Sequence, residues 1–510
     1  MTATGAVLAT ASYTFDNNFL PTGLSLASAG KTVQAALTWD KDGLLTGFGP
    51  FTLTRGGPGG ALSQFKDTVA TTAYGYDTLA RPATRTQQVN GQTPYTAQLS
   101  YDLSGRIVGK TETVGGVNTT YAYGYDPGGQ LTEVRRNGAV TERYAYDANG
   151  NRTSRQLGGG AVETATYDRQ DRLRQRGAVT YQFNSDGFLT QRGSDTFQYS
   201  TRGQLLQATV GGQTLTYGYD GLGRRISRTD SGGTTQYLYG DPASHLITAV
   251  RTPNGDFTTL YYDTAGLLTA LERNGTRYYV ATDQVGTPRV VSDATGASVK
   301  VLDYDSFGNL TSDSNPGFDL PLGYAGGLAD TVIGLIHFGF RDYDPAAGRW
   351  TARDPVLFAS GQGNLYVYVG NSPIGYRDPS GLFCISVTIY AGVGGGVSTC
   401  ITDEGASVCG ELGLGVGAGA EPDRFGDLEE TGTSVGAEAA ATLGPFEVGT
   451  GYSLDDKGCL KGGPKGVVDL ADLLEESSTQ LAEKFSGGLG KLKVGLEAKV
   501  AAKGCVQGKW

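Results

Sequence analysis

The sequence predicts a mainly β protein, built as a long repeat of short strands. Three observations predict it. Glycine makes up 80 of the 510 residues and tyrosine 29, whereas glycine ordinarily makes up about 7% of a protein. Tyr-Asp pairs recur along the chain at a fairly even spacing. Residues typical of helices do not dominate any segment before about residue 467.

The Tyr-Asp pairs mark the units of the repeat. They recur at intervals of roughly 16–25 residues, which suits a strand–turn–strand unit. The pairs are Tyr76-Asp77, Tyr101-Asp102, Tyr125-Asp126, Tyr146-Asp147, Tyr167-Asp168, Tyr219-Asp220, Tyr262-Asp263 and Tyr304-Asp305, with degenerate copies at Phe183-Asn184, Tyr199-Ser200 and Tyr239-Gly240.

Each unit contains a strand pattern followed by a turn pattern. Before one pair, Leu215, Tyr217 and Tyr219 alternate with small or polar residues and are expected to share one face of a strand. The aspartate then starts a turn by accepting hydrogen bonds from backbone N–H groups downstream, and a glycine supplies the positive φ that the turn needs. Such hairpins are not stable alone, so we expect them to stack into one long sheet.

A denser group of motifs follows the repeat. It contains GLIHFGFRDYDP (334–345), GRWTARDP (348–355), GNLYVYV (363–369) and DPSGL (378–382). Two carboxylates held close together share a proton and can act as acid and base. Asp342 and Asp344 stand two residues apart and would share one strand face, so either could pair with Asp354. The Asp-Pro pairs, at Asp344, Asp354 and Asp378, are also typical of plain turns.

These repeats and motifs resemble the Rhs/YD-repeat family, which includes polymorphic toxins, the C components of insecticidal toxin complexes, and teneurins. The repeats resemble it over roughly residues 70–382, and the dense motifs resemble its Rhs-associated core domain. The resemblance implies a spiralling β-sheet shell with an inward plug. It also implies a single-turnover, aspartic-type autoprotease without cofactor or metal, which uses Arg341, Asp342 and Asp354 to cut between Leu382 and Phe383.

Three parts are therefore expected along the chain: YD/Rhs β-repeats (1–278), the core domain (279–382) and a variable C-terminal module (383–510). All five cysteines and most of the excess negative charge lie in the last part. The cysteines suit either an oxidising compartment or buried free thiols. His337 is expected to be a packed or rim histidine, because no Ser-His-Asp spacing accompanies it.

The C-terminal module is expected to be small and β-rich. Its glycine-rich segments alternate like strands, and one amphipathic helix is expected over Val467–Phe485. No multi-turnover activity is evident in it, because it contains no histidine and no phosphate-binding loop that follows a strand. It is expected to be either a small toxin or an inert binding module, and contact with membranes is left open.

The function expected from these observations is a shell that encapsulates its own C-terminal module and frees it by cleavage. The net charge of −10 argues against nucleic-acid partners. Expected partners are the module itself, an upstream shell-completing or secretion-system protein, and an immunity protein. We expect a secreted or cell-surface protein that is exported by a dedicated system or lacks part of its N-terminus. The alternative is an adhesive or carbohydrate-binding repeat with an inert tail.

Overall fold

The computed structural model describes residues 2–3, 9–241, 244–360 and 362–382, together with the strands named below after residue 382. It divides into two compact units, Met1–Phe383 and Cys384–Trp510, which we call unit 1 and unit 2. Within unit 1 we call residues 9–278 the wall and residues 279–382 the plug. The predicted domain borders at residues 278 and 382 stay predictions.

A sheet of 31 strands forms most of unit 1. Each strand pairs antiparallel with the next one along the chain, so the sheet is a continuous meander from β1 to β31. The strands are β1 (Thr2–Ala3), β2 (Ala9–Phe15), β3 (Pro21–Ser28), β4 (Lys31–Trp39), β5 (Leu45–Phe48), β6 (Phe51–Thr54), β7 (Gln64–Lys66), β8 (Ala70–Tyr76), β9 (Pro82–Val89), β10 (Gln92–Tyr101), β11 (Ile107–Val114), β12 (Val117–Tyr125), β13 (Leu131–Arg136), β14 (Ala139–Tyr146), β15 (Arg152–Leu157), β16 (Glu163–Tyr167), β17 (Leu173–Arg176), β18 (Val179–Phe183), β19 (Leu189–Arg192), β20 (Asp195–Tyr199), β21 (Leu205–Val210), β22 (Gln213–Tyr219), β23 (Arg225–Asp230), β24 (Gly233–Leu238), β25 (Ala249–Arg251), β26 (Phe257–Tyr262), β27 (Leu268–Arg273), β28 (Thr276–Thr282), β29 (Pro288–Ser292), β30 (Ser298–Tyr304) and β31 (Leu310–Asp313).

The Tyr-Asp turn has the geometry that its residues predict. In the unit at Asp102, one carboxylate oxygen accepts the backbone N–H groups of Ser104 and Arg106, both at 2.9 Å. Gly105 adopts a φ of 78°, a conformation that a residue with a Cβ rarely takes. The other carboxylate oxygen pairs with the Arg106 guanidinium at 2.7 Å. The aspartate–arginine pair recurs at Asp77, Asp168 and Asp220, although Ala80 and Asp171 take the glycine's positive-φ position in the first two.

The tyrosine of each pair ties neighbouring units together. The hydroxyl of Tyr125 donates to the carbonyl of Ile107, and that of Tyr146 to the carbonyl of Leu131, each at 2.7 Å. Equivalent hydrogen bonds start from Tyr167, Tyr219 and Tyr262. The tyrosines therefore hold the sheet together by both their rings and their hydroxyls.

The plug continues beyond the large sheet with a second, four-stranded one. Short 3₁₀ turns accompany it, and a first such turn, η1 (Pro58–Gly60), lies in the wall. The remaining elements of unit 1 are β32 (Leu328–Asp330), β33 (Leu335–Phe338), β34 (Arg341–Asp344), β35 (Arg349–Trp350), η2 (Tyr324–Gly326), η3 (Leu357–Ser360) and η4 (Val369–Asn371).

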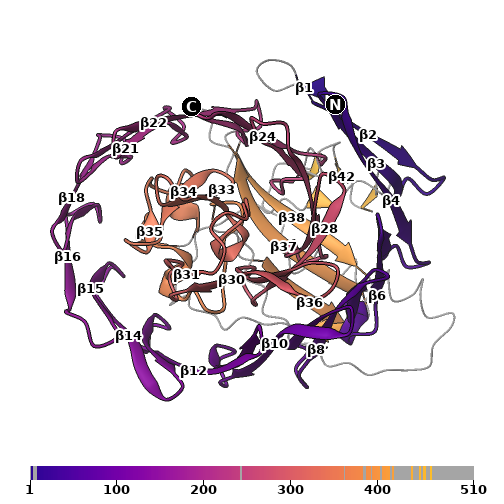
Figure 1. Cartoon of the computed structure of the whole chain (residues 1–510), viewed down its shortest axis with the longest axis horizontal. Helices are drawn as coiled ribbons and strands as arrows, with labels where there is room; N and C mark the ends of the chain where they lie inside the picture. The colour runs from indigo at the N-terminus through magenta and orange to yellow at the C-terminus, as the bar shows by residue number, and fades with distance from the viewer. Residues whose placement is uncertain are drawn as a thin grey trace. The chain divides into compact units, whose positions relative to one another are not determined.

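The wall curves around the plug. In Figure 1 the strands from β8 to β24 follow one another along a curved band, and β33, β34 and β35 lie on its inner side. Buried side chains of the inner face, such as Leu205 and Leu215, pack with Ile333, Leu335 and Ala347 of the plug. Burying a leucine contributes about 1.5–3 kcal/mol, so repeated contacts of this kind hold the plug firmly.

The later strands of the large sheet lie against the earlier ones. Buried residues of β10, Tyr95 and Ala97, pack with Ala281 and Val290 of β28 and β29. Leu26 of β3 likewise packs with Leu238 and Ala249. The sheet therefore spirals, its later turn packing on its earlier one. This confirms the predicted mainly β, spiralling fold.

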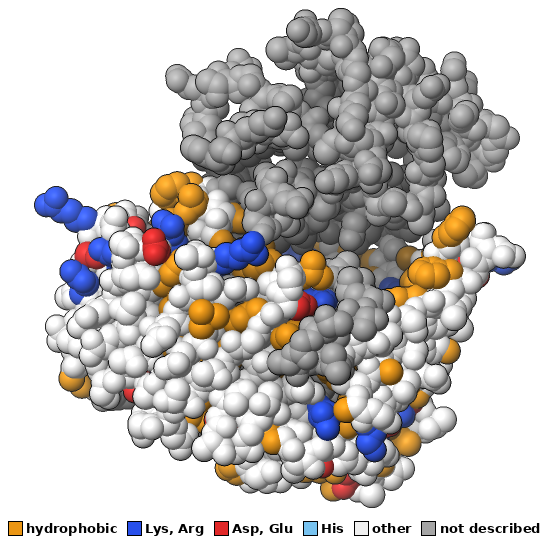
Figure 2. Space-filling model, turned by 90° about the horizontal axis from the view of Figure 1, so that it is seen from above, with side chains coloured by type: hydrophobic (Ala, Val, Ile, Leu, Met, Phe, Trp, Pro, Cys, Tyr) orange, Lys and Arg blue, Asp and Glu red, His pale blue; other side chains and the backbone are white. Residues whose placement is uncertain are grey.

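The visible outer surface of unit 1 is poor in charge. Figure 2 shows uncharged polar side chains and backbone over most of it, with hydrophobic and charged side chains scattered between them. This agrees with a sequence in which only 18% of residues are charged.

Unit 2 contains a five-stranded and a three-stranded sheet. The β-rich module that was predicted is therefore present, whereas the helix predicted over residues 467–485 lies outside the described residues. Its strands are β36 (Ser386–Ala391), β37 (Val393–Thr402), β38 (Gly405–Gly413), β39 (Val416–Ala418), β40 (Glu438–Ala439), β41 (Glu447–Val448), β42 (Tyr452–Leu454) and β43 (Leu460–Lys461).

Candidate active site

Two of the predicted catalytic residues, Arg341 and Asp342, are neighbours on β34 of the plug. β33 pairs with β34 so that His337 stands opposite Asp342 and Phe338 opposite Arg341. Side chains alternate along a strand, so Arg341 and Asp342 point to opposite faces of β34. These two faces carry two different groups of charged residues.

The first group surrounds Arg341. Its Nη2 lies 3.0 Å from a carboxylate oxygen of Asp354 and 3.2 Å from one of Asp378. Its Nε donates to the carbonyl of Gly381, and its guanidinium lies 4.1 Å from the centre of the Trp350 ring. Each charged residue of the group is at most 3% exposed, so water screens these interactions little.

Burial sets the protonation of this group. It raises the pKa of Asp354 above its ordinary value, although Arg341 opposes the shift. It also lowers the pKa of the Arg341 guanidinium, against the pull of Asp354 and Asp378.

The cleavage motif is fixed against the same group. Asp378 accepts hydrogen bonds from the Ser380 hydroxyl at 3.0 Å and from the Leu382 N–H at 3.1 Å. The Phe340 N–H donates to the Ser380 carbonyl at 2.8 Å. Leu382 is buried, and Phe383 lies outside the described residues.

Glycines allow this close approach of two backbones. A Cβ on Gly339 would lie 2.1 Å from the Ser380 carbonyl oxygen, and one on Gly381 would lie 2.3 Å from that of Phe338. Both positions also have positive φ, 45° and 69°. Any other side chain at either position would push the cleavage motif away from Arg341.

The second group surrounds Asp342 on the opposite face of β34. Arg225 of β23 donates from Nη2 to both carboxylate oxygens of Asp342, at 2.8 and 3.0 Å. Nδ1 of His337 lies 3.2 Å from the same carboxylate. Burial alone would raise the pKa of Asp342, but Arg225 and His337 outweigh it and hold this pKa below its usual value.

Asp344, the rival for a place in the dyad, lies on the same face as Asp342, as the sequence spacing predicts. It pairs with Arg192 of β19 at 3.3 Å. The structure thus brings together Arg341, Asp354 and the segment that ends at Leu382, whereas Asp342 and Asp344 bind arginines of the wall. The catalytic roles of Arg341, Asp342 and Asp354 stay predictions.

From the sequence, Asp378 is expected only to start a turn within the cleavage motif. Its carboxylate joins Arg341 to the backbone of Leu382. The tight Asp-Pro-Ser-Gly sequence is the signal that could have indicated this, because such an aspartate accepts hydrogen bonds from N–H groups downstream.

A cavity of about 320 Å³ lies between the plug and the wall, next to the cleavage motif. Its lining includes His245, His337, Gly339, Arg377, Pro379 and Ser380. Nε2 of His337 is buried and, among the described residues, meets no hydrogen-bond partner. Burial and the nearby Arg225 lower the pKa of His337 to about 4, so the ring is neutral at pH 7.

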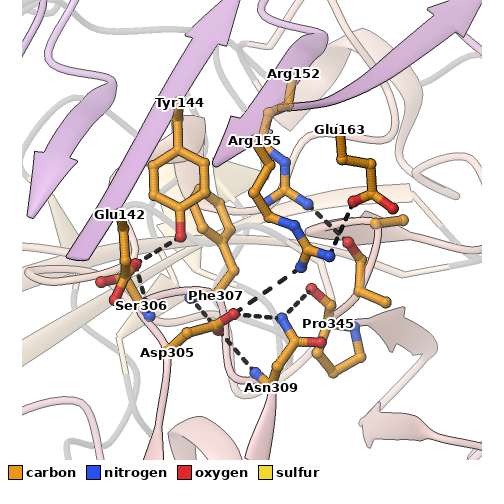
Figure 3. Close-up of polar contacts among 12 residues, drawn as sticks. Glu142, Tyr144, Arg152, Arg155, Glu163, Asp305, Ser306, Phe307, Asn309 and Pro345 are labelled. Atoms are coloured by element: carbon orange, nitrogen blue, oxygen red, sulfur yellow. Dashed lines mark hydrogen bonds and ion pairs between the residues drawn. The ribbon is translucent and has the colours of Figure 1, made fainter. Parts of the chain in front are cut away.

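A third polar group joins β14 of the wall to the plug segment that follows β30 (Figure 3). Glu142 of β14 accepts hydrogen bonds from the Tyr144 hydroxyl at 2.5 Å and the Ser306 N–H at 3.2 Å. Next to it, Asp305 accepts a hydrogen bond from the Asn309 side chain at 2.7 Å. Burial and the neighbouring Asp305 raise the pKa of Glu142 to about 7.

No group of three or more His, Cys, Asp or Glu side chains that could hold a metal ion occurs among the described residues. No helix in the described part of the chain is long and apolar enough to cross a membrane.

Comparison with known proteins decides the family. The sequence model described as "Teneurin YD-shell" matches residues 2–374. The chain belongs to the teneurin YD-shell family. The prediction of an Rhs/YD-repeat protein is therefore confirmed, and the wall with its plug is an encapsulating β-shell.

Curated relatives of this YD-shell chain include animal teneurins. Human Teneurin-4 is 35% identical over 298 residues, which are 55% of this chain and 11% of that protein. Teneurin-1 of Gallus gallus is 39% identical over 296 residues, with the same two shares. The chain thus covers about a ninth of the length of these relatives.

Solved structures with a similar backbone fold come from toxin complexes. A TcdB2–TccC3 crystal structure without its hypervariable C-terminal region is 16% identical, with a TM-score of 0.48, and the match covers 74% of this chain and 24% of that one. A Photorhabdus luminescens Tc holotoxin pore is 15% identical, with a TM-score of 0.43, over 74% of this chain and 26% of that one.

Proposed function

We propose that this YD-shell chain is the encapsulating shell of a bacterial Rhs-type toxin that cuts itself once, after Leu382, and so frees residues 383–510 as an effector. The observation that carries the proposal is the position of Arg341. It binds Asp354, Asp378 and the Gly381 carbonyl together, one residue before the bond to be cut.

The chemistry needs a proton donor close to this bond. Burial raises the pKa of Asp354 and so favours its protonated form, which is the form that a general acid needs to protonate the leaving amine. The bond is tethered in place by Asp378 and by the backbone contact with Phe340. Tethering supplies a high effective concentration, so cleavage needs no separate substrate pocket.

The tyrosines favour a shell over an adhesive repeat. A sugar-binding repeat needs exposed aromatic faces, whereas hydroxyls such as those of Tyr125, Tyr146 and Tyr219 are used to join neighbouring strands. We propose a secreted or cell-surface location, with the module after Leu382 as cargo and an upstream shell or secretion-system protein and an immunity protein as partners.

The test is to express the full chain, separate it on a denaturing gel and sequence any new N-terminus. A fragment that begins Phe383-Cys384-Ile385 is expected, and Asp354→Asn should abolish it. Asp330→Asn is the matched control, because Asp330 is also a buried plug carboxylate but lies with wall residues Arg228 and Tyr217. An intact parent chain that binds glycans would refute the proposal.

The effector role of residues 383–510 needs its own assay. Expression of this module alone in bacteria or insect cells is expected to arrest growth, and the full Asp354→Asn chain, which keeps the module attached, is expected not to. Equal growth in both cultures would remove the toxin part of the proposal and leave the shell.

A further inference from the structure

We propose that the cavity between plug and wall binds a small molecule that carries a carboxylate on an apolar body, and that the Arg377 guanidinium holds this carboxylate. Such binding goes beyond the shell function and is independent of the self-cleavage proposed above.

The cavity has the size and lining of a small-molecule site. Its volume of about 320 Å³ lies at the lower end of the roughly 300–1,000 Å³ that ligand pockets occupy. Aliphatic side chains from both parts line it, Leu246 and Ile247 from the wall and Leu322 and Leu328 from the plug. Leu246 and Ala265 are exposed, so the cavity opens to the surface of unit 1 beside them. An apolar body that enters there is buried against the aliphatic side chains.

The charged end of Arg377 borders this cavity. Its Nη2 donates to the Ala265 carbonyl, and a Cβ added to Gly266 would lie 3.8 Å from the same nitrogen. A Cβ added to Gly326 would lie 3.8 Å from Nη1. Ala265, Gly266 and Gly326 all line the cavity together with Arg377. The guanidinium, and not only the aliphatic stem of Arg377, is therefore within reach of a ligand in the cavity.

No carboxylate of the described residues neutralises this guanidinium. Within that part of the chain it makes one hydrogen bond, to the Ala265 carbonyl, and no carboxylate oxygen lies within 4.0 Å of it. Its other N–H groups have no partner there, yet none of them is sealed from solvent. Arg341, by contrast, meets Asp354 and Asp378 at 3.0 and 3.2 Å.

The acids that lie farther from Arg377 are used by other groups. Asp263 accepts a hydrogen bond from the Tyr74 hydroxyl at 2.8 Å, and both Asp263 and Asp283 accept backbone N–H groups of their own turns. Burial lowers the pKa of the Arg377 guanidinium, and attraction by Asp263 and Asp283 does not offset it. An arginine nevertheless keeps its charge in a protein. A buried cation without a direct partner is costly, so a ligand that brings an anion to it is bound favourably.

A single carboxylate suits this site better than a more highly charged anion. One guanidinium can hold both oxygens of a carboxylate, and its one positive charge balances one negative charge. His245 and His337 also line the cavity, but burial lowers the pKa of both rings, so they add no positive charge at pH 7. A second negative charge would therefore be buried without a partner.

The test is calorimetric titration of the purified full chain. Two acids represent two sources of this chemistry, octanoate for a fatty acid and 3-phenylpropanoate for an aromatic acid. Saturable binding of at least one of them is expected, and the acid that binds more tightly identifies the source. The uncharged 1-octanol should bind about 10–100-fold more weakly than octanoate, because it cannot form a charged hydrogen-bonded pair with Arg377. Failure of both acids to bind, or equal affinity for octanoate and 1-octanol, would overturn the proposal.

Variants locate the binding site. Arg377→Gln should weaken binding of the acid by about 10–100-fold and leave that of 1-octanol unchanged. Arg224→Gln is the matched control, because Arg224 lines the same cavity but is paired with Asp220 at 2.8 Å, and its affinity should stay within about threefold of the parent. An Arg377→Gln chain that keeps the parent's affinity for the acid would overturn the proposal.

A second variant covers the case in which Arg377→Gln does not fold. Leu246→Trp places a larger ring at the exposed opening of the cavity and should weaken binding of octanoate and 1-octanol alike. Unchanged affinity for both in this variant would show that they bind elsewhere and would also overturn the proposal. A parent chain that binds the acid but is never cut would refute self-cleavage alone.

Discussion

At two junctions between plug and wall, the surroundings shift the pKa of a buried carboxylate in opposite directions. At the first, Asp342 of the plug meets Arg225 of the wall, and the arginine and His337 hold its pKa below the usual value against the effect of burial. At the second, Glu142 of the wall meets Asp305 of the plug, and burial with this second acid raises the pKa of Glu142 to about 7 (Figure 3).

The difference lies in the charge that each carboxylate faces. Arg225 is 2% exposed and bonds directly to Asp342. Asp305 pairs with Arg155 only at 4.0 Å, and Arg155 is also paired with Glu163 at 2.9 Å. Asp342 at the first junction therefore stays ionised at all ordinary pH values. At the second junction, ionisation of Glu142 lowers the free energy of unfolding as the pH rises.

The largest effect is expected from Arg225→Met, which leaves Asp342 buried without its arginine. Removal of one partner of a buried ion pair costs about 3–5 kcal/mol in the free energy of unfolding. Guanidinium unfolding followed by tyrosine and tryptophan fluorescence measures it. Arg228→Met is the control, because Arg228 is 17% exposed and its loss should cost less. Equal losses of unfolding free energy in the two variants would contradict the prediction.

A second prediction concerns the pH dependence of stability at Glu142. Its pKa in the folded protein, about 7, lies above the ordinary value of 4.5. Between these values the unfolded chain loses this proton while the folded chain keeps it, so the free energy of unfolding falls as pH rises from 4.5 to 7. At about 1.4 kcal/mol for each pH unit, the loss is at most about 3.5 kcal/mol.

The variant Glu142→Gln should abolish this decline, so that it is more stable than the parent at pH 8 and equal to it at pH 4. Glu112→Gln is the matched control. Burial raises the pKa of Glu112, but Lys110 and Arg289 outweigh it and lower this pKa, so its replacement should destabilise the protein at pH 8. A parent whose stability is unchanged between pH 4.5 and 7 would contradict the prediction.

The smallest effect on the free energy of unfolding is expected from the ion pair of an exposed Tyr-Asp turn. Arg106 pairs with Asp102 at 2.7 Å, but both side chains are more than a fifth exposed. Exposed pairs of this kind contribute about 0.2–1 kcal/mol. Arg106→Gln should therefore shift the unfolding midpoint slightly and leave cleavage unchanged. A loss of unfolding free energy as large as that of Arg225→Met would contradict this prediction, because one exposed turn would then determine the stability of the whole wall.

The repeat could be predicted because its signals are local. The Asp102 turn needs a carboxylate, a glycine and backbone N–H and C=O groups that all lie within residues 102–106, so its signal is visible in the sequence. The alternation around Tyr217 likewise determines which face is buried. The motifs around Arg341 predicted which segment approaches Leu382.

The plug–wall contacts could not be predicted, because they depend on the curvature of the sheet. Arg225 and Asp342 are 117 positions apart, and Glu142 and Ser306 are 164 apart. Nothing in the residues between them encodes how far the wall turns per strand. The assignment of Asp342 and Asp354 to different faces also became visible only once the register of β34 with β33 was known.

The strand order of the wall has a consequence for how the chain is made. Each strand pairs with the one before it, so the sheet can grow in step with synthesis, and every new hairpin docks on a finished edge. The plug is made last of unit 1 and must find β23, which is completed long before it. Arg225 reaches Asp342 only in that final step, so on the self-cleavage proposed above the bond after Leu382 would be cut only after the plug has docked on the wall. If the proposed cleavage occurs, the appearance of the cut chain would therefore report that assembly is complete.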